Sequence, residues 1–447
     1  MGINQKVKTQ VDYLARANQL SKEGNLTEAI INYRCAIDNK PTISAYQGLA
    51  NALKKQGNIE DAISCYQEAL NINPNLPQIH TAIGYLLNIN RELNQAIDYY
   101  LKAVELRPDY WVAHSRLRRL KLNENQTKKI INSLEKVIKN NPDSIFPSLT
   151  LGYILVEQGK TSEAVNYIKK ATDSNVSKLK PSFSRSKGNG VGKRNPNFMI
   201  IGSAKSGTTS LYNYLVQHPQ VLPAITKEIG YFDTKRYKNG LDWYLSHFPE
   251  ITEGDHLFLT GEATPTYLNR HNIAERVHTL FPEVKLIVIM RNPVERTVSA
   301  YHHSVKDNGE QRSLEEVINA EMQLIQGMSD PSEIMIPANR VKAKYRFEPR
   351  YVVFSLYYYF LRKWFNVFPR EQFLILNSSD FYTKTPEVMN QVFSFLDLPN
   401  YELSEYRQYT KGSYSSINKY LRENLSEFFQ PHNQKLEDYL GIKLNWD

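Results

Sequence analysis

A short segment near the middle of the chain constrains its fold more than any other. The apolar run at residues 198–201 stops at Gly202, small residues follow, and helical spacing resumes at Ser210. This pattern predicts a strand, a loop and a helix in direct succession. The backbone N–H groups of such a loop, together with the positive end of the helix dipole, form a site for a phosphate group. We therefore expect an α/β domain that binds an anionic ligand.

The loop differs from a nucleoside-triphosphate loop at one decisive position. Gly202 and Gly207 have the spacing of G-x-x-x-x-G-K-[ST], but Thr208 stands where that motif has its lysine, and the lysine of this loop is Lys205. The apolar run of the second expected strand ends at Arg291, where a triphosphate-binding protein would have an acidic metal ligand. An arginine repels Mg²⁺ and attracts a second phosphate. The pattern therefore disfavours a kinase and favours a nucleotide with two separate anionic groups.

These two segments together resemble the sulfotransferases that use 3′-phosphoadenosine 5′-phosphosulfate (PAPS). K-S-G-T-T follows the first strand, and R-N-P-x-E-R-x-x-S follows the second. The resemblance implies that Arg291 and Ser299 bind the 3′-phosphate, that the product is adenosine 3′,5′-bisphosphate (PAP), and that no metal is required. It also implies that the 5′-phosphosulfate is bound by Lys205, Ser206, Gly207, Thr208, Thr209 and Ser210.

The rest of residues 197–447 looks like the heparan-sulfate-type carbohydrate sulfotransferases in particular. The segment K-E-I-G-Y-F-D places Glu228 where those enzymes have their proposed catalytic base. Lys411 and Gly412 match their Lys-Gly nucleotide loop. The resemblance implies that Glu228 takes a proton from the acceptor while Lys205 stabilises the leaving phosphate, since sulfuryl transfer depends mainly on positioning and charge stabilisation.

Three acidic residues have alternative interpretations. Glu228 could be a surface residue paired with Lys227 rather than a base. Asp233 is a candidate for substrate contact, but it could equally cap a turn. Glu262, in a segment that matches the family's E-K-[ST]-P-x-Y, is also a candidate for substrate contact, or it could hold the end of a strand.

Three features depart from the carbohydrate enzymes. Ala263 stands where they usually have a lysine, and Gly230 stands where some have a histidine. The late cysteine pair of the secreted enzymes is absent, since Cys65 is the last cysteine of this chain. The first two features leave the acceptor open, and the third is typical of a reducing compartment.

Alternating apolar runs and helical patterns predict an α/β domain over residues 197–447. Its parallel sheet should be covered by helices on both faces, with the ligand at the carboxyl ends of the strands. The expected strands lie near 198–201, 257–260, 284–290 and 373–376. The expected helices lie near 209–217, 314–326, 353–367 and 386–396.

Residues 1–171 contain a different pattern, a repeat of 33 or 34 residues. Ala29, Ala62 and Ala96 share one position of the repeat, and tyrosines, glycines and prolines recur at others. This resembles the tetratricopeptide repeat, with about five copies and a degenerate fourth. The resemblance implies an all-α solenoid whose concave face binds a protein or peptide partner. A structural spacer and a dimerisation surface are the alternatives.

The segment between the two domains, residues 172–196, reads as a flexible basic linker. It contains six basic residues and one acidic residue, which supply more than half of the chain's net charge of +9. Because most of the excess charge lies on this tether, we do not expect a nucleic-acid partner.

The N-terminus lacks the apolar core of a secretory signal, and no apolar run has the length of a membrane span. Two cysteines and scattered histidines offer no zinc site. We expect a cytoplasmic protein that transfers a sulfuryl group from PAPS to a hydroxyl or amine, on a carbohydrate acceptor. The alternative is a catalytically inactive adaptor whose repeats recruit partner proteins.

Overall fold

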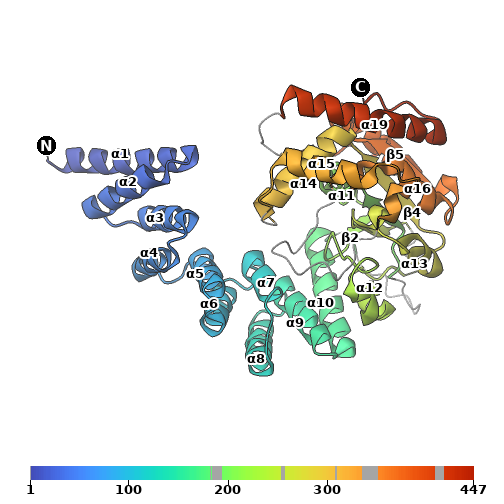
Figure 1. The fold of residues 1–447 in the computed structure, drawn as a ribbon. Helices are drawn as coiled ribbons and strands as arrows, with labels where there is room; N and C mark the ends of the chain where they lie inside the picture. The colour runs from blue at the N-terminus through green and yellow to red at the C-terminus, as the bar shows by residue number, and fades with distance from the viewer. Residues whose placement is uncertain are drawn as a thin grey trace. The chain divides into compact units, whose positions relative to one another are not determined.

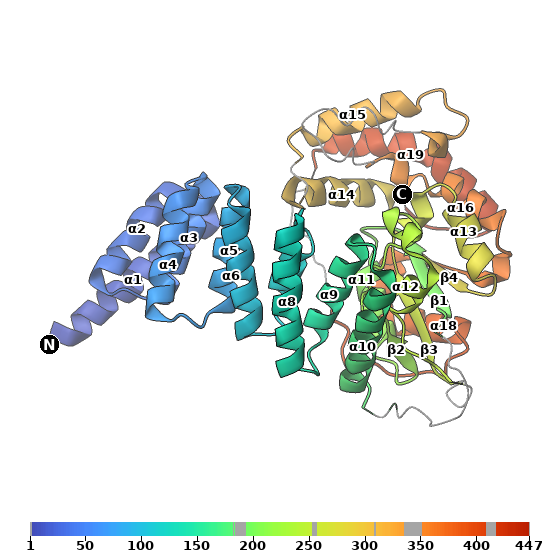
Figure 2. The same ribbon diagram turned by 90° about the horizontal axis from the view of Figure 1, so that it is seen from below.

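The chain divides into two compact units, Met1–Ser174 and Asn175–Asp447. The structure, a computed structural model, describes residues 2–181, 183, 194–252, 257–307, 310–334, 351–407 and 417–446, and side chains from residue 13 onward. Figures 1 and 2 show the elements of both units from two directions.

Within the part of the chain described, the first unit is all α-helical, as the repeat pattern predicts. The helices are α1 (Gly2–Glu23), α2 (Leu26–Asn39), α3 (Ile43–Gln56), α4 (Ile59–Ile72), α5 (Pro77–Ile89), α6 (Leu93–Leu106), α7 (Trp111–Leu117), α8 (Glu124–Asn140), α9 (Ile145–Glu157) and α10 (Thr161–Leu179).

Small residues permit the close approach of helices in this unit. The repeated alanines Ala29, Ala62 and Ala96 are fully buried. A Cβ added at Gly48 would lie 2.3 Å from the ring of Tyr33. Because nothing larger than hydrogen fits there, the glycine lets a tyrosine of one helix pack directly on the backbone of the next.

Helix α10 corrects the predicted linker. It continues to Leu179, so residues 172–179 are helical, and the buried side chains of Thr172 and Val176 explain why the helix persists. Beyond it, the ammonium group of Lys180 donates to the carbonyl oxygen of His218 at 2.9 Å. Residues 182 and 184–193 lie outside the described residues, and their assignment as a linker stays a prediction.

The second unit is built on a five-stranded parallel sheet in the order β2-β3-β1-β4-β5, which confirms the predicted α/β class. The strands are β1 (Phe198–Gly202), β2 (Val221–Pro223), β3 (Leu259–Ala263), β4 (Lys285–Met290) and β5 (Phe373–Asn377). The flanking α-helices are α11 (Thr208–Leu215), α12 (Leu241–Leu245), α13 (Ile273–Leu280), α14 (Pro293–Asp307), α15 (Leu314–Ile325), α16 (Tyr357–Phe365), α17 (Ser378–Thr383), α18 (Thr385–Phe395) and α19 (Lys419–Leu440).

Strand β3 begins and ends later than the prediction of 257–260. Leu257, its expected first residue, has an exposed fraction of 59%, whereas Thr260 and Glu262 are fully buried. Gly261 explains why a strand can form over this polar stretch. A Cβ at that position would lie 2.3 Å from the carbonyl oxygen of Phe198 on β1, so the glycine allows the two backbones to approach closely.

The strand order determines where a ligand can bind. Strand β1 lies between β3 and β4, and the chain passes from one side of β1 to the other between those two strands. In sheets of this kind, ligands usually bind at the carboxyl ends of the strands on either side of this switch, which here are β1 and β4. The loop after β1 and the residue Arg291 after β4 lie at this edge.

Candidate active site

Residues 203–207, which we call the phosphate loop, connect β1 to the N-terminus of α11. Lys205 has a φ of +73° and Gly207 a φ of +114°, so the backbone turns sharply before the helix begins. The N–H of Ser203 donates to the carbonyl oxygen of Ile289 on β4 at 2.8 Å, which fastens the start of the loop to the sheet. The segment from β1 to α11 thus forms the strand, turn and helix that its sequence predicts.

A buried hydroxyl in this loop is unpaired. Ser206 has an exposed fraction of 1%, and its Oγ makes no hydrogen bond within the described residues. An unpaired buried hydroxyl costs free energy unless a ligand supplies its partner. Thr208 and Ser210 on α11 are also buried, while Thr209 is half-buried. The donor chemistry at this helix N-terminus fits a phosphate or phosphosulfate group.

Arg291 contacts the phosphate loop from the neighbouring strand. Its Nη1 donates to the carbonyl oxygen of Lys205 at 3.3 Å, and its Nη2 lies 3.4 Å from Oε2 of Glu295. Tyr357 donates to the carbonyl oxygen of Arg291 at 2.9 Å and fixes the backbone at the end of β4. Ser299 lies on α14 with an exposed fraction of 8%. The structure therefore brings the two sequence motifs together.

Arg296 makes the same kind of contact, and our sequence analysis assigned it no role. Its Nε donates to the carbonyl oxygen of Ala204 at 3.2 Å. Its Nη1 donates to the carbonyl oxygen of Tyr351 at 2.8 Å and to Oγ of Ser355 at 3.2 Å. The side chain is buried, so these carbonyl dipoles replace water around its charge. Its place in R-N-P-x-E-R was the signal that could have revealed it.

Glu321 on α15 supports this arginine indirectly. Its carboxylate accepts hydrogen bonds from the backbone N–H groups of Tyr351 at 2.7 Å, Val352 at 2.7 Å and Val353 at 3.1 Å. Burial raises the pKa of Glu321 to about 7, against the opposing effect of these three donors and of the Arg296 charge. The carboxylate thereby holds the turn whose carbonyl oxygen anchors Arg296.

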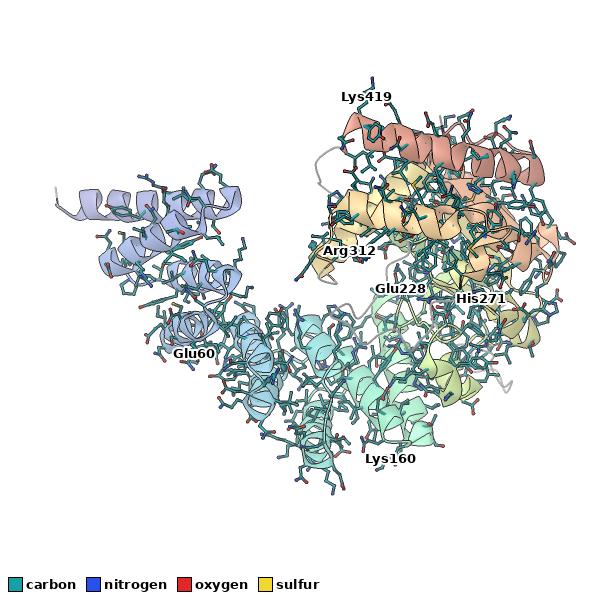
Figure 3. All side chains as sticks on the ribbon, viewed as in Figure 1. Glu60, Lys160, Glu228, His271, Arg312 and Lys419 are labelled. Carbon is teal, nitrogen blue, oxygen red and sulfur yellow. The ribbon has the colours of Figure 1, made fainter. Side chains whose placement is uncertain are left out.

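Glu228, the predicted base, is exposed and is labelled in Figure 3. Its side chain has an exposed fraction of 54%, and Oε1 lies 2.5 Å from Nζ of Lys227. This is the ion pair that the alternative surface interpretation predicts. However, the same Nζ donates to Oγ1 of Thr209 at 3.0 Å, and the carbonyl oxygen of Lys227 accepts from Ala263 at 2.9 Å. The pair therefore lies between the end of β3 and the first turn of α11.

Glu262, for which the sequence leaves a structural role and substrate contact open, lies at the end of β3. It is fully buried, and its carboxylate accepts from the hydroxyls of Tyr244 at 2.7 Å, Tyr267 at 3.1 Å and Thr264 at 2.5 Å, and from the N–H of Ile229 at 3.4 Å. Burial raises its pKa to about 7, while the four donors act in the opposite direction. This arrangement favours a support for the segment that contains Glu228 over contact with a substrate.

Asp233 lies at the other end of that segment. Its Oδ2 accepts from the hydroxyl of Thr266 at 2.5 Å. Its Oδ1 is buried and forms no hydrogen bond with the residues described. Gly230, nearby, has a φ of +61°, a conformation that glycine adopts without strain. Contact of Asp233 with a substrate stays a prediction.

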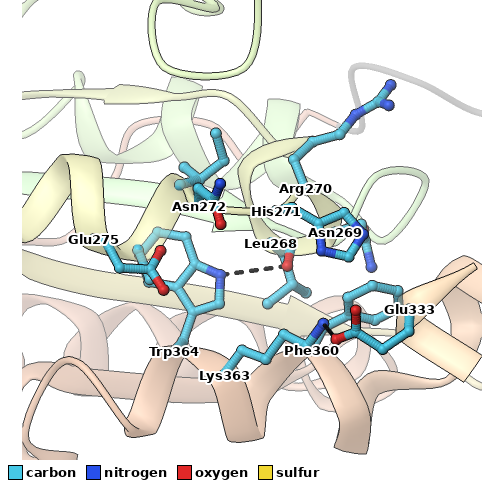
Figure 4. A pocket seen from close by; sticks show the side chains of 12 residues that line it. Leu268, Asn269, Arg270, His271, Asn272, Glu275, Glu333, Phe360, Lys363 and Trp364 are labelled. Atoms are coloured by element: carbon cyan, nitrogen blue, oxygen red, sulfur yellow. Dashed lines mark hydrogen bonds and ion pairs between the residues drawn. The ribbon is translucent and has the colours of Figure 1, made fainter. Parts of the chain in front are cut away.

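A separate cavity of about 260 Å³ lies between the segment that follows β3 and helix α16 (Figure 4). Trp364 donates from Nε1 to the carbonyl oxygen of Leu268 at 3.3 Å across it, and Lys363 pairs with Glu333 at its edge. None of the predicted site residues that the structure describes lines this cavity. The expected nucleotide residues Lys411 and Gly412 lie outside the described part of the chain.

The chain matches known families over both units. The sulfotransferase domain family matches residues 195–436. The chain belongs to the sulfotransferase family. Tetratricopeptide-repeat families match residues 50–88, 77–110 and 149–175, which confirms the nature of the first unit. We therefore refer to the second unit as the sulfotransferase domain.

The sulfotransferase domain is similar in sequence to several named sulfotransferases. The membrane-associated sulfotransferase kil1 of Dictyostelium discoideum is 28% identical over 313 residues, which cover 56% of this chain and 66% of the relative. Mouse heparan sulfate glucosamine 3-O-sulfotransferase 5 is 30% identical over 275 residues, 56% of this chain and 74% of the relative. Human bifunctional heparan sulfate N-deacetylase/N-sulfotransferase 3 is 33% identical over 221 residues, but the match spans only 23% of that protein.

A solved sulfotransferase from Alicyclobacillus acidocaldarius aligns with 56% of this chain and 98% of its own, at 27% identity and a TM-score of 0.43. In the described residues, no helix of the sulfotransferase or the repeat unit has the length and apolar character to cross a membrane. The cytoplasmic location stays a prediction.

Proposed function

We propose that the sulfotransferase domain binds PAPS between the phosphate loop and α14, and that it transfers the sulfuryl group to a hydroxyl or amine of a carbohydrate. In this proposal Arg291 and Ser299 bind the 3′-phosphate, and Lys411 and Gly412 contribute to nucleotide binding. The 5′ side is bound by Lys205, Ser206, Gly207, Thr208, Thr209 and Ser210.

The contact between Arg291 and the carbonyl oxygen of Lys205 is the observation that carries this proposal. It joins two anion-binding motifs, from separate strands, at one edge of the sheet. A nucleoside triphosphate needs one such site and a metal ligand, whereas a nucleotide with anions on both its 3′ and 5′ positions needs two. The cationic side chain at the end of β4 therefore favours PAPS.

The chain's own residues suit the chemistry of transfer. PAPS, when bound, supplies the sulfuryl group and leaves as PAP. Lys205 and the N–H groups at the start of α11 stabilise negative charge on the phosphate side. Glu228 is exposed, so an acceptor hydroxyl can reach its carboxylate and lose a proton to it. Lys227 holds that carboxylate near Thr209 and thus near the phosphate loop.

The proposed carbohydrate acceptor rests on the relatives, two of which are named for heparan sulfate. Ala263 is fully buried and supplies no positive charge where those enzymes usually have a lysine. We therefore propose that this domain positions its acceptor differently from the way those enzymes position a heparan sulfate chain. We also propose that the repeat unit binds protein partners, because none of its residues suggests a catalytic role.

Radiolabelled donor and a panel of glycans, lipids and peptides test the proposal with the purified chain. The variant Glu228→Gln should keep the affinity for PAP and lose about 10²- to 10⁴-fold in turnover. The exposed Glu402, remote from the motifs in sequence, provides a matched control in Glu402→Gln, which should retain full turnover.

Three outcomes contradict parts of the proposal. Absence of PAP binding by the wild-type chain would exclude the whole assignment. Full turnover by Glu228→Gln would exclude Glu228 as the base. PAP binding without transfer to any acceptor would favour the inactive adaptor, which the departures at Ala263 and Gly230 first suggested.

A further inference from the structure

Arg422, on helix α19, lies beside the residues that we assign to the 3′-phosphate. Its Nη2 donates to Oε1 of Glu295 at 2.6 Å, and Oε2 of the same carboxylate lies 3.4 Å from Nη2 of Arg291. Ser299 follows Glu295 by one turn on α14, and residues at this spacing share one face of a helix. The fold therefore groups Arg291, Ser299 and Arg422 around one carboxylate, although α19 is distant from α14 in the sequence.

The two arginines and the carboxylate between them are accessible to a ligand. The side chains have exposed fractions of 48% for Arg422, 29% for Arg291 and 33% for Glu295. Among the described residues, the bond to Glu295 is the only hydrogen bond of the Arg422 side chain, so its Nε and Nη1 can donate to a ligand. A guanidinium has several N–H donors, and the fork that it presents to a carboxylate fits a phosphate equally well.

These three side chains together have a net positive charge. The carboxylate of Glu295 contributes one negative charge against the two guanidinium groups that it contacts. A phosphate monoester has close to two negative charges at neutral pH, so it can balance the remaining positive charge. The attraction is strong at a partly buried site, because the effective dielectric constant there is lower than in water.

The position of Arg422 is unfavourable for the helix itself. Helix α19 begins at Lys419, and both Lys419 and Arg422 lie near its start, in a first turn that has no acidic residue. The N-terminal end of a helix dipole is positive, so acidic residues stabilise this end and basic residues destabilise it. The ion pair with Glu295 does not account for the arginine, since ion pairs between exposed side chains contribute little to stability. A basic residue here therefore indicates a role in binding rather than in the stability of the helix.

We propose that Arg422 donates to the 3′-phosphate of the bound nucleotide, together with Arg291 and Ser299, and thereby determines the preference of the domain for a phosphate at the 3′ position. This inference rests on the proposed function, which assigns that phosphate to Arg291 and Ser299. The phosphate oxygens can accept from both guanidinium groups and from the hydroxyl at the same time. Nucleotides without a 3′-phosphate, such as adenosine 5′-monophosphate (AMP), have no acceptor for Arg422.

Titration calorimetry on the full chain tests this role with PAP, its isomer adenosine 2′,5′-bisphosphate, and AMP. The isomer has the same charge as PAP but carries the phosphate on a different carbon, so it separates direct contact from long-range attraction. In Arg422→Gln, the Kd of PAP should rise about tenfold, as expected for the loss of one charge-assisted hydrogen bond. The Kd of AMP should stay the same, and the Kd of the isomer should rise by a smaller factor than that of PAP.

Two further variants of α19 serve as comparisons. Lys435→Gln removes an exposed cation from the same helix and should bind all of these ligands like the wild type. Arg422→Lys keeps the charge but loses the planar fork, so its affinity for PAP should lie between those of the wild type and Arg422→Gln. Circular dichroism verifies the fold of each variant.

Glu295→Gln distinguishes direct contact from an indirect effect. If Arg422 contacts the phosphate, removal of the neighbouring negative charge should leave the affinity for PAP unchanged or raise it, since both arginines remain. If Arg422 acts only through Glu295 on the orientation of Arg291, Glu295→Gln should weaken PAP binding as much as Arg422→Gln does. That result would overturn the proposal.

An unchanged Kd of PAP in Arg422→Gln would also overturn the proposal, and so would an equal loss of affinity for PAP and for its 2′,5′ isomer. These results would leave the proposed function intact, because the wild type would still bind PAP. Failure of the wild type to bind PAP would contradict the proposed function itself, and the role of Arg422 with it.

Discussion

Nε of Arg296 donates to the carbonyl oxygen of Ala204 at 3.2 Å, and this bond joins helix α14 to the phosphate loop. The other end of the same guanidinium is anchored to the carbonyl oxygen of Tyr351 at 2.8 Å. Because both contacts are made by one planar group, the position of the loop depends on the position of the turn at residues 351–355. We therefore regard Arg296 as a positioning residue for the nucleotide site.

Arg296→Lys should weaken PAP binding about tenfold while the chain remains folded. A lysine cannot reproduce the fork of donors that reaches Ala204 and Tyr351 together. The loss of one hydrogen bond to a charged group is worth about 1.5–3 kcal/mol. Titration calorimetry measures the affinity, and circular dichroism verifies the fold. Lys306→Gln, an exposed cation on the same helix, is the control, and equal affinities in the two variants would refute the positioning role.

Ser206→Ala should have opposite effects on stability and on binding. The Oγ of Ser206 is buried and unpaired within the described residues, so its removal should leave the thermal midpoint unchanged or slightly higher. PAP affinity should fall about tenfold, because a charged phosphate oxygen of the ligand loses the hydrogen bond that this hydroxyl would donate. A variant that binds PAP as tightly as the wild type would show that this hydroxyl faces no ligand.

Glu262→Ala should lower the free energy of unfolding by about 3 kcal/mol or more. The change leaves the buried hydroxyls of Tyr244 and Tyr267 without their shared acceptor. Urea denaturation followed by tryptophan fluorescence measures it, since Trp243 and Trp364 lie in this unit. Glu283→Ala, at an exposed position, should cost little. A similarly small cost for Glu262→Ala would contradict the structural role.

Glu310→Gln should change the dependence of stability on pH. Hydrogen bonds from Arg312, and a further one from Tyr351, lower the pKa of Glu310 from its ordinary value near 4.5 to about 2. A lowered pKa in the folded state stabilises the protein above pH 4.5, and this contribution is lost as the pH falls from 4.5 to 2.

The variant should therefore be less stable than the wild type by about 2 kcal/mol at pH 7. The difference should shrink steadily between pH 4.5 and pH 2. Thermal unfolding at a series of pH values measures it, with Glu402→Gln as a control that shows no such slope. A difference that stays constant with pH would mean that the ionised carboxylate of Glu310 is not the stabilising group.

Local patterns in the sequence predicted much of this fold. The strand that ends at Gly202 and the strand that ends before Arg291 were recognisable because each is a continuous apolar run followed by a turn or a charge. The repeat helices were recognisable because alanine and tyrosine recur in one register. Strand β2 was not predicted, since its three residues are too few to show a pattern.

Contacts between distant residues were beyond local patterns. The burial of Glu262 depends on hydroxyls from Tyr244 and Tyr267, and a polar residue within a strand gives no apolar signal. Glu321 and the N–H of Val352 are neighbours only because the chain folds back. The same limit applies to Arg296, whose motif was visible but whose target, the carbonyl oxygen of Ala204, was not.

The central claim is that two anion-binding groups, one at Lys205 and one at Arg291, hold the two ends of a single nucleotide. Titration calorimetry with PAP on the wild type, Lys205→Met, Arg291→Met and the double variant tests it most directly. The account expects the Kd to rise at least about tenfold in each single variant and further in the double variant. An unchanged Kd in the double variant, with the fold intact, would contradict it.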